Sequence, residues 1–236
     1  YHAALRLAAD LRIAPEEIAS FRRTPAPPVR ILHSVPSMTD RDSYVRSLYG
    51  VYAGCSFSGW AVRFLSERKA DKGNFEGAKI VVVPDARRVS DQTFSALVKF
   101  AAKGGRVVVF GRDALIANEY GKPRPERQAV RDRLFRIENA ISSRKYSSIL
   151  AEELARTGLK PPVEVVSKDG KPSPFGVISR SGRTANGRET LLIVNVLGEK
   201  AEIVIPGRWR DALTDAAVSG RTALPSGAVH ILVRCD

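Results

Sequence analysis

Apolar residues in the first part of the chain come in short continuous runs, and segments with a helical period separate these runs. The run at 79–83 contains four β-branched residues in succession, which is typical of a strand buried on both faces of a parallel sheet. Similar runs predict the other strands of this sheet at 29–35, 61–65 and 106–110. Because helical segments lie between the runs, we expect parallel strands joined by right-handed crossovers.

Two helices are predicted between these strands from apolar residues spaced three or four apart. The stripe of the first helix consists of Tyr44, Leu48, Val51, Tyr52 and Cys55. The second helix is expected to begin after the N-cap residue Ser90 and to end before Gly104. Its inner stripe consists of Phe94, Leu97 and Ala101. This alternation predicts an α/β fold with a flavodoxin-like, doubly wound sheet.

The pattern changes near residue 170. Before it, helical stripes at 130–141 and 149–154 lead to a short predicted strand at 163–166. After it, turn-forming residues separate short strand patterns at 176–179, 190–196, 201–205 and 228–233. The segment 197–200 between two of them is interpreted as a hairpin. We therefore expect a small antiparallel β-domain to follow the α/β domain.

The N-terminal segment differs from both of these parts. An amphipathic pattern at 2–13 predicts a short helix, and a further helical turn is expected from Pro15, which is followed by two glutamates. The proline-rich stretch 25–28 then predicts a stiff linker. The expected organisation is a linker at 1–28, an α/β domain at 29–168 and a C-terminal β-domain at 169–236.

The composition is strongly basic, with 38 Lys and Arg against 25 Asp and Glu and a formal net charge of +13. Such a balance first suggests a polyanionic partner. The basic residues are scattered singly or in pairs, however, so we expect a solvated basic surface and no specific nucleic-acid partner. No apolar window of about 18 residues occurs, so no membrane partner is expected.

Few residues in the sequence can carry catalytic chemistry. The histidines His2, His33 and His230 are far apart, and no metal-ligand spacing or glycine-rich nucleotide motif occurs, so no catalytic residue, metal or cofactor is expected. Cys55 continues an apolar helical stripe and is expected to be buried and unreactive, whereas Cys235 is expected to be exposed. Two cysteines without a disulfide framework favour a reducing, cytoplasmic compartment.

Polar residues follow three of the predicted parallel strands, and the first of them along the chain is Ser37. Open α/β sheets bind ligands beyond the carboxyl ends of their strands. Asp85 follows one strand, and Arg112 and Asp113 follow the next, so these residues are candidate ligand-binding groups, with Glu119 and Tyr120 as lesser candidates. The alternative is that both aspartates only cap turns or helices.

Three segments of the α/β part resemble the middle domain of the family 42 β-galactosidases: 44–52 with Phe57 and 62–67; 79–86 leading into 89–94; and 104–111 continuing to 118–121. That domain is related in fold to the class I glutamine amidotransferases and is associated with trimer formation. The resemblance therefore implies an amidotransferase-like domain and a homo-oligomer, with a trimer as the family habit. The turn at Gly111, Arg112 and Asp113 stands where an amidotransferase would place its cysteine, so no amidase activity is expected.

The end of the chain extends this resemblance. Residues 210–215 with Gly220, followed by 224–232, resemble the end of glycosidase β-domains, and 3–21 would match the link out of a catalytic barrel. The resemblance implies a barrel before Tyr1 that holds the two catalytic carboxylates. This chain is then expected to be a non-catalytic accessory and oligomerisation region of a β-galactosidase-like glycoside hydrolase. The alternative is a stand-alone binding module for a sugar or an anionic ligand.

Overall fold

The computed structural model describes residues 12–23, 26–40, 42–57, 59–125, 135–137, 148–150, 152–153, 156, 158–166, 176–196 and 200–235. Contacts divide the chain into two compact units. The α/β unit consists of Ala26–Gly54 and Val62–Thr157. The β unit consists of Tyr1–Pro25, Cys55–Ala61 and Gly158–Asp236. The division expected at residues 28 and 168 stays a prediction.

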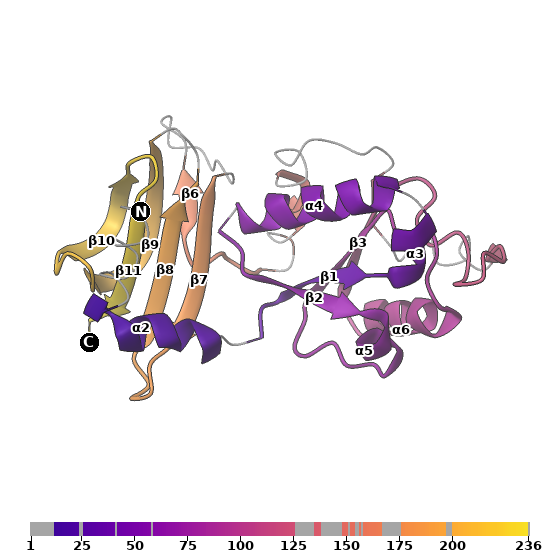
Figure 1. Cartoon of the computed structure of the whole chain (residues 1–236), viewed down its shortest axis with the longest axis horizontal. Helices are drawn as coiled ribbons and strands as arrows, with labels where there is room; N and C mark the ends of the chain where they lie inside the picture. Colours follow the sequence, from indigo (N-terminus) through magenta and orange to yellow (C-terminus); the bar gives the residue numbers. More distant parts are fainter. Residues whose placement is uncertain are drawn as a thin grey trace. The chain divides into compact units, whose positions relative to one another are not determined.

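The α/β unit is built on a five-stranded parallel sheet with the order β2-β1-β3-β4-β5 (Figure 1). Its strands are β1 (Val29–His33), β2 (Val62–Ser66), β3 (Ile80–Pro84), β4 (Arg106–Phe110) and β5 (Phe135–Ile137). The parallel pairing and the first four strands confirm the expectation from the sequence. β5 corrects the helical stripe predicted at 130–141, because residues 135–137 pair with β4 as a strand.

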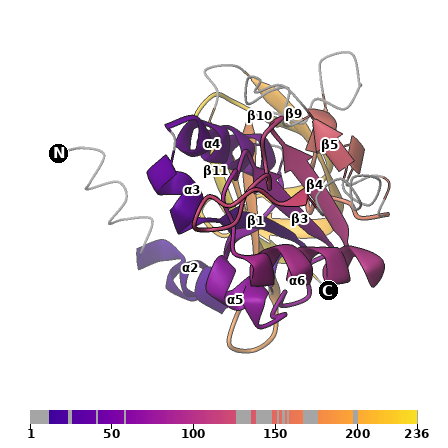
Figure 2. The same ribbon diagram turned by 90° about the vertical axis from the view of Figure 1, so that its right-hand side faces the viewer.

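Helices cover both faces of this sheet. They are α3 (Val35–Asp40), α4 (Asp42–Ser56), α5 (Glu67–Asp71) and α6 (Asp91–Ala102). α4 lies on one face, and α5 and α6 lie on the other (Figures 1 and 2). α6 begins as predicted, because the Ser90 hydroxyl accepts a hydrogen bond from the Thr93 N–H at 3.0 Å.

The core of the α/β unit consists of the strands buried on both faces. Every residue of β3 is buried, as are four residues of β1 and four of β4. Leu97 and Phe94 of α6 and Tyr44 of α4 pack against the same core. Fully burying one such apolar side chain contributes roughly 1.5–3 kcal/mol, so the β-branched runs account for much of the stability of this unit. Tyr52, which we expected in the buried stripe of α4, is instead exposed.

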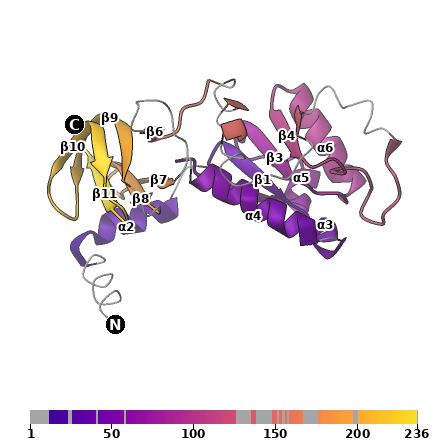
Figure 3. The same ribbon diagram turned by 90° about the horizontal axis from the view of Figure 1, so that it is seen from above.

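The β unit contains an antiparallel sheet with the order β10-β9-β11-β8-β7, and a short strand, β6, pairs with β9 (Figure 3). The strands are β6 (Glu164–Val166), β7 (Val177–Arg183), β8 (Glu189–Asn195), β9 (Ala201–Asp211), β10 (Ala217–Leu224) and β11 (Val229–Arg234). The N-terminal helix α2 (Pro15–Ser20) belongs to this unit, and the Ser20 hydroxyl lies 2.5 Å from the hydroxyl of Thr190 in β8. The antiparallel character of this part was predicted correctly.

Two features of the β unit differ from the expectations. The strand predicted at 163–166 pairs antiparallel with β9, so it lies in the second sheet and not in the parallel one. β8 and β9 both pair with β11 and are not neighbours, so the segment 197–200 does not close a hairpin between paired strands. β10 was not predicted, because its residues alternate weakly and are mostly exposed. Of the helix expected at 2–13, only residues 12 and 13 lie within the described residues.

No helix in the described part of the chain has the length and apolar character needed to span a lipid bilayer.

Tyr44 ties α4 to the end of β1, and this contact yields a prediction. Its buried hydroxyl accepts a hydrogen bond from the Ser34 N–H at 2.8 Å and donates one to the Leu32 carbonyl at 3.2 Å. Burial raises the pKa of Tyr44 to about 12, so the hydroxyl stays protonated. Tyr44→Phe leaves a buried N–H without an acceptor and should lower the free energy of unfolding by about 1–2 kcal/mol.

Urea denaturation of the two forms measures this difference. Tyr120→Phe is the matched control, because the Tyr120 side chain is exposed; it should change the free energy of unfolding by less than about 0.5 kcal/mol. Equal effects of the two substitutions would contradict the role of Tyr44.

Candidate functional site

The chain turns sharply where it leaves β3 and β4, and the two turns lie against each other. Asp85 and Gly111 both have positive φ angles, of 38° and 99°. The Asp85 N–H donates a hydrogen bond to the Phe110 carbonyl at 2.7 Å. A Cβ at position 111 would collide with the Asp85 carboxylate, so only glycine fits there. The structure thus brings Asp85 together with the turn that begins at Gly111.

Backbone hydrogen bonds join the loops that follow these turns. The Leu115 N–H donates to the Ala86 carbonyl at 2.7 Å, and the Ala117 N–H donates to the Arg87 carbonyl at 3.2 Å. In return, the Val89 N–H donates to the Ala117 carbonyl at 3.3 Å. The loop after β4 therefore runs beside the loop after β3 and satisfies its backbone polar groups.

A buried arginine fastens the same two loops. Arg124 is 6% exposed, and its guanidinium donates to the carbonyls of Val89 at 2.8 Å and Leu115 at 3.3 Å. It also pairs with Asp91 at 2.7 Å and lies 4.6 Å from the centroid of the Phe94 ring. The hydrogen bond from Arg124 holds the pKa of Asp91 below its usual value. Arg124 thus joins both loops to the start of α6.

Two serines bind the loop after β3 to the end of β1. The hydroxyls of Ser34 and Ser37 both donate to the Arg88 carbonyl, at 2.7 and 2.6 Å. The Arg88 N–H donates to the Ser37 hydroxyl at 3.0 Å, and the Arg88 guanidinium pairs with Asp40 at 2.8 Å. The edge of the sheet where open α/β folds bind ligands is therefore packed with side chains that hold its own loops.

The candidate residues from the sequence take different positions at this edge. Arg112, which follows Gly111, is exposed, and Asp113 is half-buried. Glu119 and Tyr120 lie in the turn that the Asn118 side chain organises by accepting from the N–H groups of residues 120 and 122. Tyr120 is 81% exposed, whereas Oε2 of Glu119 is buried without a hydrogen-bond partner in the described structure. Ligand binding by these residues stays a prediction.

Sequence reasoning missed Arg124, Ser34 and the backbone of Arg88. Ser37 was noted after the first predicted strand, whereas Ser34 falls inside the strand predicted at 29–35 and therefore gave no signal. Arg124 gave no signal, because its partners lie 9 to 35 residues away along the chain.

The two cysteines differ in burial. Cys55 is fully buried and burial raises the pKa of its thiol to about 12, so it is a poor nucleophile, as expected. Cys235 is exposed, as predicted. The described residues contain no cluster of three or more His, Cys, Asp or Glu that could hold a metal ion.

His230 makes a polar contact within the β unit. Its Nδ1 lies 2.7 Å from Oδ2 of the buried Asp211. Burial opposes ionisation of Asp211, but the hydrogen bonds from His230 and from the Leu213 N–H outweigh it and lower the pKa of this carboxyl. The contact joins β11 to β9.

One unit contains a parallel sheet with helices and the other an antiparallel sheet, and solved structures align with this chain. A catalytic mutant of Gan42B, a GH42 β-galactosidase from G. stearothermophilus, aligns with a TM-score of 0.69 and 14% identity over 90% of this chain. An exo-carrageenase GH42 from Bacteroides ovatus aligns with a TM-score of 0.67 and 18% identity over 96% of this chain. A β-galactosidase from Bacillus circulans sp. alkalophilus aligns with a TM-score of 0.66 and 16% identity over 90% of this chain. The chain therefore has the fold of part of these enzymes.

The aligned region covers a minor share of each of these enzymes. It corresponds to 40% of the Gan42B chain, 31% of the exo-carrageenase chain and 42% of the Bacillus β-galactosidase chain. No family model and no curated protein matches the sequence.

The close approach of Gly111 to Asp85 yields a prediction. Gly111→Ala forces a side chain into a left-handed conformation and against the Asp85 carboxylate, so it should destabilise the protein by about 2–4 kcal/mol. Gly104→Ala is the matched control, because Gly104 has a φ of 88° but open surroundings, and it should cost only about 1 kcal/mol. Urea denaturation compares the two, and equal costs would show that the Asp85 contact is unimportant.

Proposed function

We propose that this chain is a non-catalytic accessory and self-association region of a glycoside hydrolase of the β-galactosidase type. The observation that carries the proposal is the two-part alignment: one superposition covers 90% of this chain but 40% of the length of a GH42 β-galactosidase. On this proposal the chemistry belongs to a catalytic barrel outside this chain, whose two carboxylates cleave the glycosidic bond.

The finer assignment is a flavodoxin-like sheet of the class I amidotransferase type. The strand order β2-β1-β3-β4-β5, with helices on both faces, supports it. The turns after β3 and β4 begin with Asp85 and Gly111, and neither residue supplies a thiol. We therefore propose that the amidotransferase-like unit has a structural role without amidase chemistry.

The packing at the carboxyl ends of the parallel strands supports a role without catalysis. Ser34, Ser37 and Arg124 direct their polar atoms at backbone groups of the protein itself. Groups engaged in this way are not available to bind and polarise a substrate. Asp85, Arg112, Asp113, Glu119 and Tyr120 remain candidates for a weak ligand site at this edge, as in the alternative of a sugar-binding or anion-binding module.

An aromatic patch on the α/β unit supports self-association. The patch consists of Tyr49 and Tyr52 on α4 and Phe64 on β2, which are 72%, 41% and 46% exposed. The rings of Tyr52 and Phe64 stack with centroids 5.7 Å apart. β2 is an edge strand, so the patch adjoins unpaired backbone groups. Exposed apolar patches of this kind mark protein interfaces, and we propose a second copy of this chain as the partner, in a homo-oligomer such as a trimer.

The net charge of +13 opposes this association. Several arginines are neutralised by ion pairs within the chain, among them Arg88 with Asp40 and Arg221 with Glu202. These pairs lie on different elements, so we propose a dispersed basic surface and no specific nucleic-acid partner. The remaining repulsion is screened over a Debye length of about 8 Å at physiological salt.

Light scattering across a salt series tests the proposal. The isolated chain should form an oligomer that weakens as salt is lowered, because screening of like charges is lost. In the double variant Tyr49→Glu/Phe64→Glu the dissociation constant of the oligomer should rise at least about tenfold, because charges would enter the apolar contact. Tyr120→Glu is the control for an added carboxylate, since it places one glutamate on an exposed tyrosine outside the patch.

Two outcomes would contradict the proposal. A monomer at every protein and salt concentration would remove the self-association role. Turnover of a nitrophenyl galactoside by the isolated chain would remove the non-catalytic role.

A further inference from the structure

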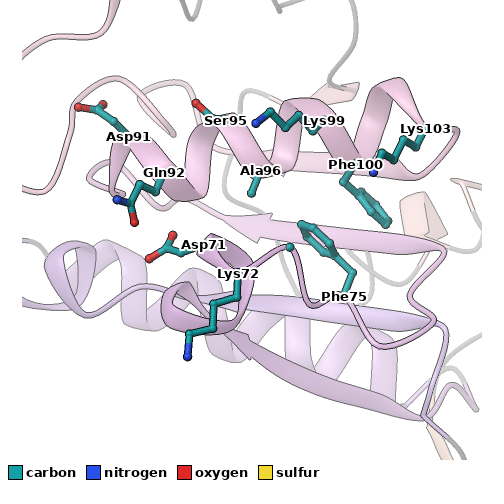
Figure 4. Close-up of a pocket in the computed structure, with 11 residues that line it drawn as sticks. Asp71, Lys72, Phe75, Asp91, Gln92, Ser95, Ala96, Lys99, Phe100 and Lys103 are labelled. Carbon is teal, nitrogen blue, oxygen red and sulfur yellow. The ribbon is translucent and has the colours of Figure 1, made fainter.

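An open groove runs between α6 and the segment that follows α5 (Figure 4). It encloses about 570 Å³, which is within the range of small-molecule sites. Three lysines, Lys72, Lys99 and Lys103, and two phenylalanines, Phe75 and Phe100, contribute to its lining. The groove lies within the α/β unit and away from the residues of the aromatic patch.

The acidic residues of the groove are engaged by the protein itself. Asp71 accepts hydrogen bonds from the hydroxyls of Ser90 at 3.1 Å and Thr93 at 2.5 Å. Asp91 is paired with Arg124 at 2.7 Å. Both carboxylates therefore have partners that hold them in place. The charge of Asp91 is paired with Arg124, whereas Asp71 keeps its negative charge, so three lysines face one carboxylate that has no cationic partner in the described structure.

The lysines carry the positive charge of the groove. Lys99 lies on α6, and Lys103 is the C-cap residue one turn later. Both are exposed, and their spacing places them on the same side of the helix (Figure 4). In the described structure neither forms an ion pair. An ammonium group of this kind is a strong donor to sulfate, phosphate or carboxylate.

A fixed aromatic surface lies beside these lysines. Phe100 projects from α6 toward Phe75, and the two rings stack with centroids 4.5 Å apart at 25° (Figure 4). Gly105 lies against the Phe100 ring, where any Cβ would collide with it, so the ring is held from that side. Gly73, which also lines the groove, has a φ of 66° and open space around the position of a Cβ.

We propose that this groove binds an anionic sugar ring, with its carboxylate or sulfate at Lys99 and Lys103 and its ring on the surface formed by Phe75. The two lysines account for the preference for an anion, and the phenylalanines offer an apolar face to the C–H groups of a ring. Gln92 and Ser95, also on α6, offer amide and hydroxyl groups to the sugar hydroxyls. The choice of a sugar rests on the proposed function, whereas the choice of an anion rests on the groove itself.

Calorimetric titration of the full chain at low ionic strength tests the proposal. Galacturonic acid and galactose 6-sulfate are the two probes, and neutral galactose is the comparison. At least one anionic probe should bind with a dissociation constant on the order of 1 mM, and galactose should bind at least about tenfold more weakly. The relative affinities of the two probes distinguish a carboxylate from a sulfate as the preferred anion.

Matched variants locate the binding. Lys99→Gln/Lys103→Gln should lower the affinity for the anionic probe at least about tenfold. Lys160→Gln/Lys200→Gln removes the same charge from exposed positions of the β unit and should leave the affinity unchanged. Phe75→Leu should lower the affinity for galacturonic acid but leave the affinity for inorganic sulfate unchanged.

Three results would overturn the proposal: no binding of either probe, equal binding of galactose, or equal loss in the two lysine double variants. Binding of benzoate as tight as that of galacturonate would overturn the sugar assignment. These results are separate from the light-scattering test, because the groove variants leave Tyr49, Tyr52 and Phe64 intact. A monomer that still binds galacturonate through Lys99 and Lys103 would refute the self-association role alone.

Discussion

The backbone groups at the carboxyl ends of β1, β3 and β4 must find hydrogen-bond partners where the adjoining strands are buried on both faces. An unpaired buried N–H or carbonyl is costly, so the loops that leave these strands cannot take arbitrary paths. Ser34 and Ser37 bind the backbone of Arg88, Arg124 binds the carbonyls of Val89 and Leu115, and the two loops bind each other. This requirement determines the paths of the loops at the carboxyl ends of the parallel strands.

The same requirement shapes the functional interpretation. An edge used for catalysis would leave polar side chains directed at an open crevice, whereas here several of them hold the protein's own backbone. Two further surfaces proposed for partners lie elsewhere in the α/β unit. One is the aromatic patch of Tyr49, Tyr52 and Phe64, and another is the groove beside α6 with Lys99 and Lys103. We propose that the patch binds a second copy of the chain and that the groove binds an anionic sugar.

The parts of the fold predicted from the sequence are those with a strong local signal. The β-branched run of β3 and the Ser90 cap of α6 act within a few residues, and the structure confirms both. Features that depend on distant pairing were missed: residues 163–166 join the second sheet, and β11 separates β8 from β9. Local pattern cannot reveal such pairings, because any short apolar run can complete either sheet. Likewise, the position of Asp85 directly after a strand was predicted correctly, whereas the position of Arg124 depends on contacts far along the chain.

Native-state hydrogen exchange of the loops at the sheet edge tests the central claim most directly. The amides of Asp85, Leu115 and Arg124 donate to backbone carbonyls at 2.7, 2.7 and 2.8 Å. If these loops are a fixed part of the core, their opening free energies should lie within about 1 kcal/mol of those in β3. The amide of Gly121, in the turn at Asn118–Lys122, should exchange much faster. Exchange of Asp85 and Leu115 as fast as Gly121 would show a mobile edge able to open for a ligand, and would contradict this account.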